Sequence, residues 1–329
     1  MRAVQVLEFG SYELADVAEV ADPVAGPGQV LLDIHAVPLN FVDLLVIGGK
    51  YQFLPKLPFT PGKGPAGIVR ALGAGVTSLA VGDRVLAMAE YGGYAEKIAV
   101  DASQCYRLPD ALSFADAGAA SLVFDTSWFA LRERARIAPG ETVLVLGATG
   151  GVGLASVQLA KAMGARVLAG ISSLAKADIA LAAGADEVID LSAADLRESL
   201  RAQVYAVTDG KGVDIVLDML GGDIFDAAIR ALAWRGRLVV IGFAAGRIPT
   251  IKTNYLLVKN IEVSGLQVSD YRKRRPEQVA ECYREVFGFF EKGTLKPLPH
   301  RTMPLEDFRA GLKMIEERKT TGRIVLLPR

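Results

Sequence analysis

The chain has 329 residues, of which 51% are hydrophobic and 22% charged, and its 37 basic and 37 acidic residues give a formal net charge of zero. This length predicts about two domains, and the composition indicates a folded protein and excludes a disordered one. The neutral charge argues against a nucleic-acid binder, and two cysteines with two histidines are too few for a structural zinc cluster or a disulfide framework.

No run of apolar residues reaches the ~18 that a transmembrane helix needs. The first residues, Met1–Val6, lead directly into a strand-like pattern and lack the apolar segment of a signal peptide. We therefore expect a cytoplasmic protein without a membrane partner.

Residues 1–122 are expected to form a first domain that is rich in β-strands. Val30–Val37 and Gly82–Ala87 have strand-like patterns, and turns that contain glycine or proline recur between such segments, for example at 25–28 and 73–75. Short strands with frequent turns predict an all-β, barrel-like domain.

Residues 123–266 have a different pattern, in which apolar strands alternate with helices. Strands are expected at 142–146, 166–171, 187–190, 213–218, 237–242 and 261–265, and the clearest helices at 152–163 and 176–183. This alternation predicts an α/β domain with a doubly wound parallel sheet of about six strands, the architecture of a dinucleotide-binding (Rossmann) domain.

Residues 267–329 predict two helices, at 276–292 and 305–318, and a closing strand at 322–327. We expect this segment to return to the first domain, which is then discontinuous. The basic run Arg272–Arg275 is interpreted as a solvated loop.

The segment Gly147–Gly153, between an apolar strand and a helix, has the composition of a dinucleotide-binding turn. Gly150 would let the backbone approach a pyrophosphate, Gly153 would let the helix pack closely on the strand, and the helix N-terminus would offer N–H groups to phosphate. A tight turn without a ligand is the alternative. The expected cofactor-binding residues of this segment are Ala148, which replaces a glycine of the usual pattern, and Thr149, Gly150, Gly151, Val152 and Gly153.

The end of the second strand of this domain indicates which nucleotide is bound. Domains that bind NAD place a carboxylate there, whereas this chain has Ser172, Ser173 and, further on, Lys176. Hydroxyl groups and a cation suit the 2′-phosphate of NADPH, so NADPH is favoured over NADH. The alternative role of Ser172, as a helix N-cap, is compatible with phosphate binding.

Further motifs run through the chain: Asn40-Phe41-Val42-Asp43 with Gly49 and Tyr51, Pro61-Gly62, Val81-Gly82-Asp83-Arg84-Val85, Gly92-Gly93-Tyr94-Ala95-Glu96, Asp218-Met219-Leu220-Gly221-Gly222, Gly242-Phe243-Ala244-Ala245-Gly246 and Gly322-Arg323-Ile324-Val325-Leu326. Together with the glycine-rich turn, they make the whole chain resemble the zinc-independent medium-chain dehydrogenases/reductases. Within this superfamily the chain is most similar to the NADPH:quinone oxidoreductase family.

The resemblance implies a GroES-like partial barrel for the first domain and a Rossmann domain for the second, with NADPH in the cleft between them. It also implies a homodimer in which the last Rossmann strands of two subunits pair edge to edge. Zinc-dependent relatives hold their metal through a cysteine, a His-Glu pair and a further cysteine or aspartate. Here Asn40 and Lys63-Gly64 occupy the places of the first ligands, so no zinc is expected.

Three positions depart from the family pattern. Many relatives have an arginine where this chain has Ile47, a glutamate where it has Gly64, and a tyrosine at the 2′-phosphate where it has Leu191. The first two positions concern the substrate pocket, and the third concerns the preference for NADPH.

The family positions also suggest residues at the site of reaction. Asn40 would lie near the nicotinamide and the acceptor and hydrogen-bond a ring or carbonyl oxygen, with a simple turn residue as the alternative. Tyr51 would donate to a reduced oxygen or serve only as a pocket wall, and Asp43 is expected to be a buried carboxylate that orders the Asn40 loop. Further cofactor contacts are expected from Thr126, Gly242 and Phe243.

The sequence thus predicts hydride transfer from NADPH to a small acceptor, a quinone or a similar electron-poor compound, without a metal. A reductase of enoyl or acrylyl thioesters or enones on the same scaffold is the first alternative. A non-catalytic NADPH-binding protein with a structural or RNA-binding role is the second, and the balanced charge weighs against RNA.

Overall fold

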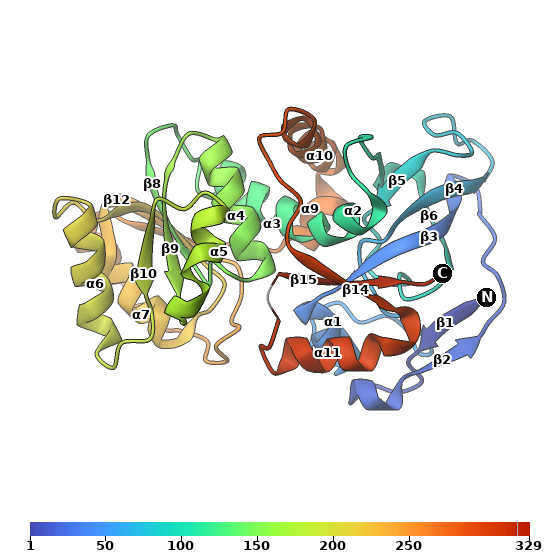
Figure 1. Ribbon diagram of the computed structural model, residues 1–329, viewed down its shortest axis with the longest axis horizontal. Coiled ribbons are helices and arrows are strands. Elements are labelled where there is room, and N and C mark those ends of the chain that lie inside the picture. The colour runs from blue at the N-terminus through green and yellow to red at the C-terminus, as the bar shows by residue number, and fades with distance from the viewer. Residues whose placement is uncertain (321) are drawn as a thin grey trace. The chain divides into compact units, whose positions relative to one another are not determined.

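The computed structural model describes residues 1–320 and 322–329, and these form two compact units (Figure 1). The first unit consists of Met1–Leu122, Arg272–Glu291 and Pro297–Arg329, and the second of Val123–Tyr271 and Lys292–Lys296. The chain therefore leaves the first unit after residue 122, as predicted, and returns to it at Arg272 and not at residue 267.

The first unit is built on an extensive β-sheet whose strand order is β14-β15-β3-β4-β5-β7, with β6 also paired to β3. Its strands are β3 (Gln29–Leu39), β4 (Ala66–Leu72), β5 (Arg84–Ala87), β6 (Lys97–Asp101), β7 (Cys105–Arg107), β14 (His300–Pro304) and β15 (Arg323–Leu327). The long strand β3 alternates buried and half-buried residues along most of its length, as expected of a strand with one face on the core.

The last strand of the chain completes this sheet. β15 pairs antiparallel with β3, in a register that sets Ile324 opposite Leu39. The pairing brings Arg323 beside the end of β3, where Asn40 begins the helix α1 (Phe41–Ile47). Residues from the two ends of the chain thus meet at one place in the first unit.

The first unit also contains four helices and a small two-stranded sheet. The helices are α1, α2 (Phe114–Ala120), α10 (Pro276–Glu291) and α11 (Phe308–Glu316), and the small sheet pairs β1 (Arg2–Gln5) with β2 (Asp16–Glu19). The predicted helix at 305–318 begins with a 3₁₀ turn, Leu305–Asp307, before α11.

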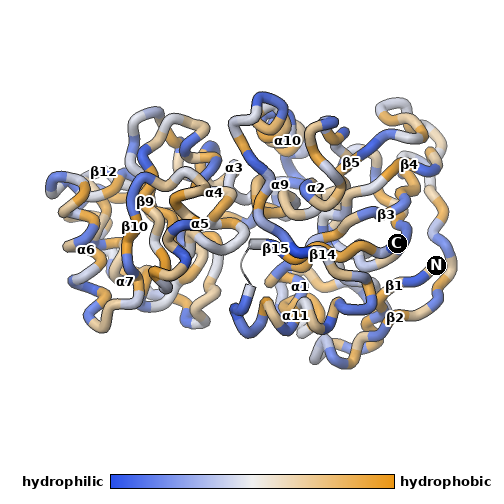
Figure 2. The backbone as a smooth tube through the Cα atoms, in the orientation of Figure 1, coloured by the Kyte–Doolittle hydropathy of each residue, from blue (hydrophilic) through white to orange (hydrophobic). Residues whose placement is uncertain are grey.

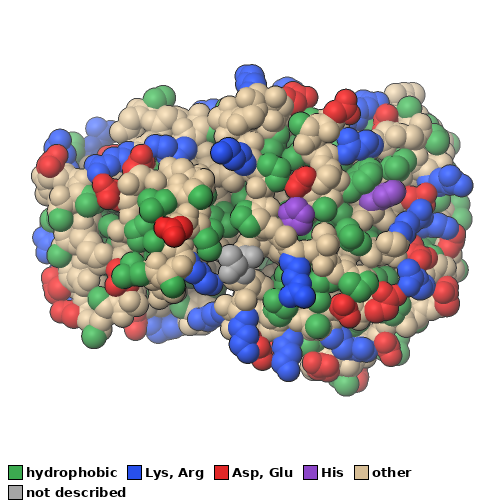
Figure 3. Space-filling view, in the orientation of Figure 1, with side chains coloured by type: hydrophobic (Ala, Val, Ile, Leu, Met, Phe, Trp, Pro, Cys, Tyr) green, Lys and Arg blue, Asp and Glu red, His purple; other side chains and the backbone are tan. Residues whose placement is uncertain are grey.

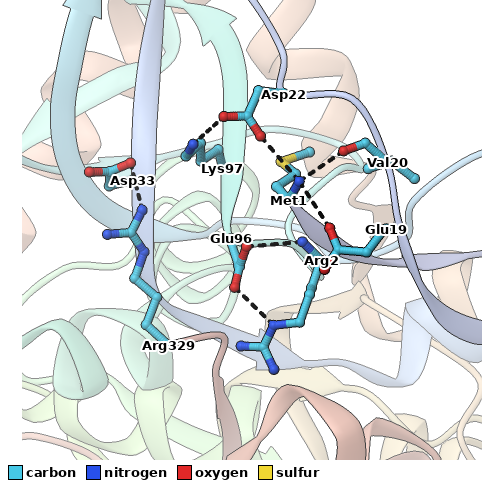
Figure 4. A network of polar contacts seen from close by, with 9 residues as sticks. All are labelled: Met1, Arg2, Glu19, Val20, Asp22, Asp33, Glu96, Lys97 and Arg329. Carbon is cyan, nitrogen blue, oxygen red and sulfur yellow. Dashed lines mark hydrogen bonds and ion pairs between the residues drawn. The ribbon is translucent and has the colours of Figure 1, made fainter.

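Ion pairs fasten both chain termini to the first unit (Figure 4). The Arg2 Nε donates to Glu96 Oε1 at 2.9 Å, and the Arg329 Nη2 lies 2.7 Å from Asp33 Oδ1. The amino group of Met1 donates to a backbone carbonyl and lies near two carboxylates. Because most of these side chains are partly exposed, we regard the pairs as contacts that order the termini rather than as a large source of stability.

The second unit contains the predicted parallel sheet. Its strands, in the order β10-β9-β8-β11-β12-β13, are β8 (Thr142–Leu146), β9 (Arg166–Ile171), β10 (Glu187–Asp190), β11 (Val213–Asp218), β12 (Leu232–Val240) and β13 (Glu262–Gly265), and every pairing is parallel. In order of sequence this is 3-2-1-4-5-6, the arrangement of a Rossmann domain. The predicted six-stranded parallel sheet is confirmed for the described residues.

Helices pack on both faces of this sheet (Figure 1). They are α4 (Gly151–Ala162), α5 (Ala177–Ala182), α6 (Leu196–Val207) and α7 (Gly222–Ala231). The helix α3 (Val123–Trp128) packs against α4, and α8 (Asn254–Lys259) precedes the edge strand. The central strands are almost continuously apolar because both of their faces are covered, and Figure 2 shows hydrophobic residues concentrated along them.

The surface carries both signs of charge. On the face shown in Figure 3, basic and acidic side chains are interspersed over both units. Within the described part of the chain, no helix is both long enough and apolar enough to cross a membrane.

Candidate functional site

The glycine-rich turn between β8 and α4 is shaped by two glycines. Gly147 has a φ of +76°, a conformation that side chains other than glycine's rarely adopt. A Cβ on Gly153 would lie 2.2 Å from the Gly147 carbonyl oxygen, so only glycine lets α4 start this close to the turn. The backbone N–H groups of Gly147 and Ala148 donate to the Gly170 carbonyl of the neighbouring strand, which fixes the turn to the sheet.

The tip of this turn suits a phosphate. Gly150 is exposed, and a Cβ there would meet only the Gly147 carbonyl, at 3.4 Å. It caps the N-terminus of α4, where the first N–H groups have no carbonyl within the helix to bind and the helix dipole is positive. Thr149, Gly151 and Val152 are half-buried around it, while Ala148 and Gly153 are buried. The predicted residues therefore form a cradle that fits a pyrophosphate.

The segment after β9 is open to solvent. Ser172 and Ser173 are exposed, Lys176 is half-buried, and the structure gives these three side chains no hydrogen bond or ion pair among the residues it describes. The short helical turn Leu174–Lys176 begins without a side-chain cap, so the alternative role of Ser172 as a helix cap is not seen. Leu191, in contrast, is 6% exposed and packs in the core of the second unit.

Two loops at the carboxyl ends of β11 and β12 bind each other. Asp218, which ends β11, accepts hydrogen bonds from the backbone N–H groups of Leu220 and Gly221, both at 2.9 Å. Its second carboxyl oxygen is buried without a partner among the described residues. Burial raises the pKa of Asp218, and the two N–H donors oppose that rise. Gly242 N–H donates to the Asp218 carbonyl, and Phe243 follows, 41% exposed, at the predicted carboxyl edge.

Thr126 lies on α3 and is half-buried. The next residue, Ser127, donates from its hydroxyl to the Val123 carbonyl at 2.7 Å and lies 2.9 Å from the Ser156 hydroxyl on α4. These contacts hold α3, and with it Thr126, against the helix that follows the glycine-rich turn.

In the first unit, Asn40 is the centre of a buried polar network. It is 5% exposed, its Oδ1 accepts from Arg323 Nη2 at 2.7 Å, and its Nδ2 donates to the Pro38 carbonyl at 3.3 Å. Its backbone N–H donates to Asp43 Oδ2 at 2.9 Å, and the Tyr94 hydroxyl donates to the same oxygen at 2.7 Å. The prediction that Asp43 is a buried carboxylate that orders the Asn40 loop is confirmed.

The charges of this network are strongly shifted by burial. Burial raises the pKa of Asp43, against the opposing effects of the Tyr94 hydroxyl, the Lys63 charge and Asn40. Burial also raises the pKa of Tyr94 well above its ordinary value, and the charge of Asp43 adds to this. Arg323 has its pKa lowered to about 10, again by burial, with Asp43 and Tyr94 acting in the opposite direction.

Tyr51 belongs to a second polar cluster of the first unit. The Lys63 ammonium lies 5.2 Å from the centre of the Tyr51 ring and binds Glu90 Oε2 at 2.5 Å. Arg272 Nη1 binds the other oxygen of Glu90 at 2.8 Å. Burial alone would raise the pKa of Glu90, but the charges of Arg272 and Lys63 outweigh it and lower the pKa to about 2.

The interpretation of Arg272–Arg275 as a solvated loop is wrong in two respects: the first three residues are helical, and Arg272 is not solvated. This residue lies on the helix α9 (Val268–Arg274), and its side chain is only 4% exposed because it packs against Glu90. The following residues, Lys273 to Arg275, are exposed as expected.

The positions of the zinc ligands in related enzymes hold residues of a different chemistry. Gly64 has a φ of +66°, and a Cβ there would lie 1.9 Å from the Ser121 hydroxyl oxygen, so a glutamate does not fit in this backbone. The described residues contain no group of three or more His, Cys, Asp and Glu side chains that could hold a metal ion.

Glu90, Arg272, Tyr94 and Arg323 were not predicted as parts of a site. Tyr94 and Arg323 occur in family motifs, which was the available signal. Glu90 and Arg272 lie 182 residues apart in the chain and have no local pattern that pairs them.

Comparison with known proteins agrees with this architecture. The family model of the alcohol dehydrogenase GroES-like domain matches residues 26–110, and that of the zinc-binding dehydrogenases matches residues 151–285. The predicted combination of a GroES-like domain with a Rossmann domain is confirmed.

Relatives along the whole chain define the family. A quinone oxidoreductase-like protein 2 homolog from Nematostella vectensis is 38% identical over 304 residues, which cover 92% of this chain and 82% of the relative. The crystal structure of Escherichia coli quinone oxidoreductase in complex with NADPH is 30% identical, with a TM-score of 0.91 and 100% of each chain covered. The crystal structure of the CurK enoyl reductase is 25% identical, with a TM-score of 0.88, and covers 99% of this chain and 98% of that one. The chain therefore belongs to the quinone oxidoreductase family of the medium-chain dehydrogenases/reductases, as its sequence predicted.

Proposed function

We propose that this protein uses NADPH to reduce a quinone or a similar electron-poor acceptor by hydride transfer. The observation that carries the proposal is the cradle at Gly147–Gly153 together with the open hydroxyl and ammonium groups of Ser172, Ser173 and Lys176. The E. coli relative was solved in complex with NADPH, which supports the same cofactor here. When bound, NADPH supplies the hydride, and the protein supplies binding and alignment.

The second unit would hold the cofactor through its own backbone. The N–H groups at the start of α4 and the absence of a side chain at Gly150 favour the pyrophosphate, and the helix dipole adds to this preference. Lys176 and the two serines favour a 2′-phosphate, whose charge a carboxylate would repel. Asp218 keeps the turn after β11 in place through its two backbone hydrogen bonds.

The first unit would orient the acceptor. Asn40 is held by Arg323, Asp43 and Pro38, so its amide oxygen has a fixed direction and one remaining lone pair. As an acceptor, this oxygen would hold the hydroxyl group of the reduced product or an N–H group of the cofactor without reorganising, and not a carbonyl oxygen as the sequence suggested, because the Asn40 Nδ2 donates to Pro38 and Asp43. Tyr51 adds a half-buried aromatic ring for a conjugated acceptor and a phenol that can supply a proton.

We propose that no metal takes part in the reaction. The support is the chemistry of the side chains at the ligand positions: Asn40 supplies an amide, Lys63 a cation, and Gly64 no side chain. An ammonium group repels a zinc ion instead of binding it.

An assay of NADPH oxidation with metal-free protein tests the proposal. Turnover with simple quinones that is unaffected by chelators is the expected result. Turnover that disappears with chelators, or NADPH and NADH both failing to bind in calorimetry, would contradict it. The enoyl reductase among the structural relatives favours a second candidate, an enoyl thioester reductase. Rapid reduction of enoyl thioesters without detectable quinone reduction would select that candidate.

We further propose that the protein forms a homodimer through β13. This strand pairs with β12 on one side, and no other described strand binds its second side. The preceding helix α8 exposes Leu257 and Val258, which are 79% and 74% exposed. Proline at Val263 would remove a backbone donor from the edge strand. Light scattering should show a dimer for the native protein and a smaller species for that variant, and a native monomer would refute the proposal.

A further inference from the structure

The first unit has a patch of exposed apolar side chains around the loop that follows α1. The exposed fraction is 36% for Phe53, 43% for Leu54 and 39% for Leu57. Two residues near the N-terminus, Leu7 and Phe9, are 70% and 37% exposed. Single exposed apolar side chains are common, but a group of them marks a binding surface for another molecule.

Contacts between the two segments join these side chains into one patch. Val6 and Phe59 pair in an antiparallel β-bridge, so the segments run side by side in opposite directions. The rings of Phe9 and Phe59 have centres 6.0 Å apart. Further along the loop, Phe53 meets the Tyr51 ring edge to face, with centres 6.3 Å apart. The patch therefore extends from the N-terminal segment to Tyr51.

Basic side chains surround this patch. Lys50 and Lys56 are exposed in the same loop. Lys273 of α9 is also exposed, and its ammonium lies over the Phe53 ring, 4.0 Å from the ring centre. The structure gives none of these three lysines an ion pair with a residue that it describes. Their charges are therefore open to a partner of opposite charge.

Acidic residues are scarce in this part of the chain. The stretch 44–82 contains no aspartate or glutamate, although 37 of the 329 residues of the chain are acidic. Glu8, which is exposed in the N-terminal segment, is an exception. We call the patch and its lysines the basic–apolar surface. It consists of the apolar residues Leu7, Phe9, Phe53, Leu54 and Leu57 and the three lysines.

This composition suits an anionic membrane better than another protein. Lysine is depleted in protein–protein interfaces, where aromatic residues, methionine and arginine are enriched. Segments that lie on a membrane combine Phe and Leu, which enter the boundary with the acyl chains, with Lys and Arg, which attract anionic headgroups. The sequence predicted no membrane partner because it lacks a spanning segment, but a peripheral contact does not need one.

We propose that the basic–apolar surface binds an anionic lipid membrane, from which this enzyme takes lipophilic quinones. The proposal rests on the proposed function, because the surface borders Tyr51 at the proposed acceptor site. Quinones with long alkyl tails dissolve in membranes, so an enzyme that reduces them has to reach the bilayer. The reaction is unchanged: the quinone takes a hydride from NADPH and a proton, which gives the quinol and NADP⁺.

Binding to vesicles tests the surface without catalysis. The probes are vesicles of phosphatidylcholine alone and vesicles of phosphatidylcholine mixed with anionic phosphatidylglycerol, sedimented with the full chain. Each lysine near an anionic surface contributes about fivefold, so the mixed vesicles should bind at least about tenfold more tightly. This preference should fall as salt screens the charges. Equal binding to the two kinds of vesicle, or binding to neither, would refute the proposal.

Variants separate the basic and apolar parts of the surface. Lys56→Gln and Lys273→Gln should each weaken binding to the mixed vesicles about fivefold at low salt. Leu54→Ser should weaken it several-fold at high salt as well, because salt does not screen its contact with the acyl chains. Lys211→Gln and Leu181→Ser are the matched controls, since both residues are exposed in the second unit and Leu181 is 44% exposed. An equal loss in these controls would contradict the assigned surface.

Turnover connects the surface with the acceptor. The probes are a ubiquinone with a long isoprenoid tail, held in the mixed vesicles, and its tail-less analogue in solution. Leu54→Ser should reduce turnover of the first several-fold and leave kcat/KM for the second unchanged. An equal reduction for both quinones would show that Leu54 supports the acceptor site or the fold, and not a membrane contact.

Failure of the inference and failure of the proposed function give different results. A protein that binds the mixed vesicles and reduces neither quinone supports the membrane contact and contradicts the proposed function. A protein that reduces the tail-less quinone and does not bind the mixed vesicles contradicts the inference alone. If vesicles do not bind and Leu54→Ser dissociates a native dimer in light scattering, a second copy of the chain covers this surface, and the inference is wrong.

Discussion

Around Asn40, in the first unit, the polar side chains bind one another, and both Asn40 and Asp43 are almost completely buried. Around Ser172 and Lys176, in the second unit, the polar side chains are exposed or half-buried and bind none of the described residues. In the first region, therefore, the geometry exists before any ligand arrives, and a substitution should mainly reduce stability. In the second region the partner is the ligand, so a substitution should mainly reduce affinity.

The largest effect is expected from Asp43→Ala. This change leaves the Tyr94 hydroxyl and the Asn40 N–H without their acceptor in a buried place, which should lower the free energy of unfolding by about 3–4 kcal/mol. Urea unfolding measures it. Asp43→Asn keeps an acceptor oxygen and should lose distinctly less. A loss below about 1 kcal/mol for Asp43→Ala would show that the network does not depend on this carboxylate.

Gly153→Ala tests the rigid part of the second unit. Its Cβ would collide with the Gly147 carbonyl, so the turn must shift, and we expect a loss of about 2–3 kcal/mol in the free energy of unfolding. Gly288→Ala in α10 is the control, because no atom lies within 4 Å of its Cβ and alanine favours a helix by up to about 1 kcal/mol. Equal stability of the two variants would contradict the close approach at Gly153.

Lys176→Ala tests the open segment. Losing one charge-assisted contact to the 2′-phosphate should weaken NADPH binding by about 1–3 kcal/mol and leave NADH binding nearly unchanged. The free energy of unfolding without cofactor should stay within about 0.5 kcal/mol of the native value, because Lys176 binds no described residue. Calorimetry with both cofactors gives the comparison. An equal loss for NADPH and NADH would show that Lys176 does not bind the 2′-phosphate.

The smallest effect is expected from Glu90→Gln, which should alter how the free energy of unfolding changes in acid. Its pKa is about 2 in the folded protein, against an ordinary value of 4.5 in the unfolded chain, so the unfolded state binds the proton first as pH falls. The stabilisation is therefore present above pH 4.5 and disappears between pH 4.5 and about 2. Allowing for partial exposure of Glu90, we expect Glu90→Gln to remove on the order of 1 kcal/mol of this pH dependence. Parallel stability curves for the two proteins over that range would show that the ion pairs of Glu90 with Lys63 and Arg272 do not stabilise the fold.

What could be predicted from the sequence was local. The apolar run Thr142–Leu146 and the glycines after it lie in one continuous segment, so the strand, the turn and the start of α4 followed from residue types alone. Asp43 is three residues from Asn40, and its role in ordering that loop could be inferred for the same reason.

What could not be predicted depends on distant residues. Arg323 reaches Asn40 across 283 positions, because β15 pairs with β3, and Arg272 reaches Glu90 across 182 positions. The run of basic residues at 272–275 predicts a solvated surface. Only the structure shows that its first residue, Arg272, binds the Glu90 carboxylate. β12 also begins at Leu232, earlier than predicted. Leu232 pairs with Val213 of β11, and the register shifts before Arg237 pairs with Ile215, with Arg235 at a positive φ between them.

The conformation of Gly64 limits how this chain could acquire a new chemistry. Restoring a His-Glu pair at residues 63 and 64 would have to place a side chain in a left-handed backbone, 1.9 Å from the Ser121 hydroxyl and 2.6 Å from Leu122. The same exchange would also remove Lys63 and its ion pair with Glu90. Conversion into a metalloenzyme would thus require rebuilding the segment around Ser121. Substitutions in that segment would have to come before the introduction of metal ligands at residues 63 and 64.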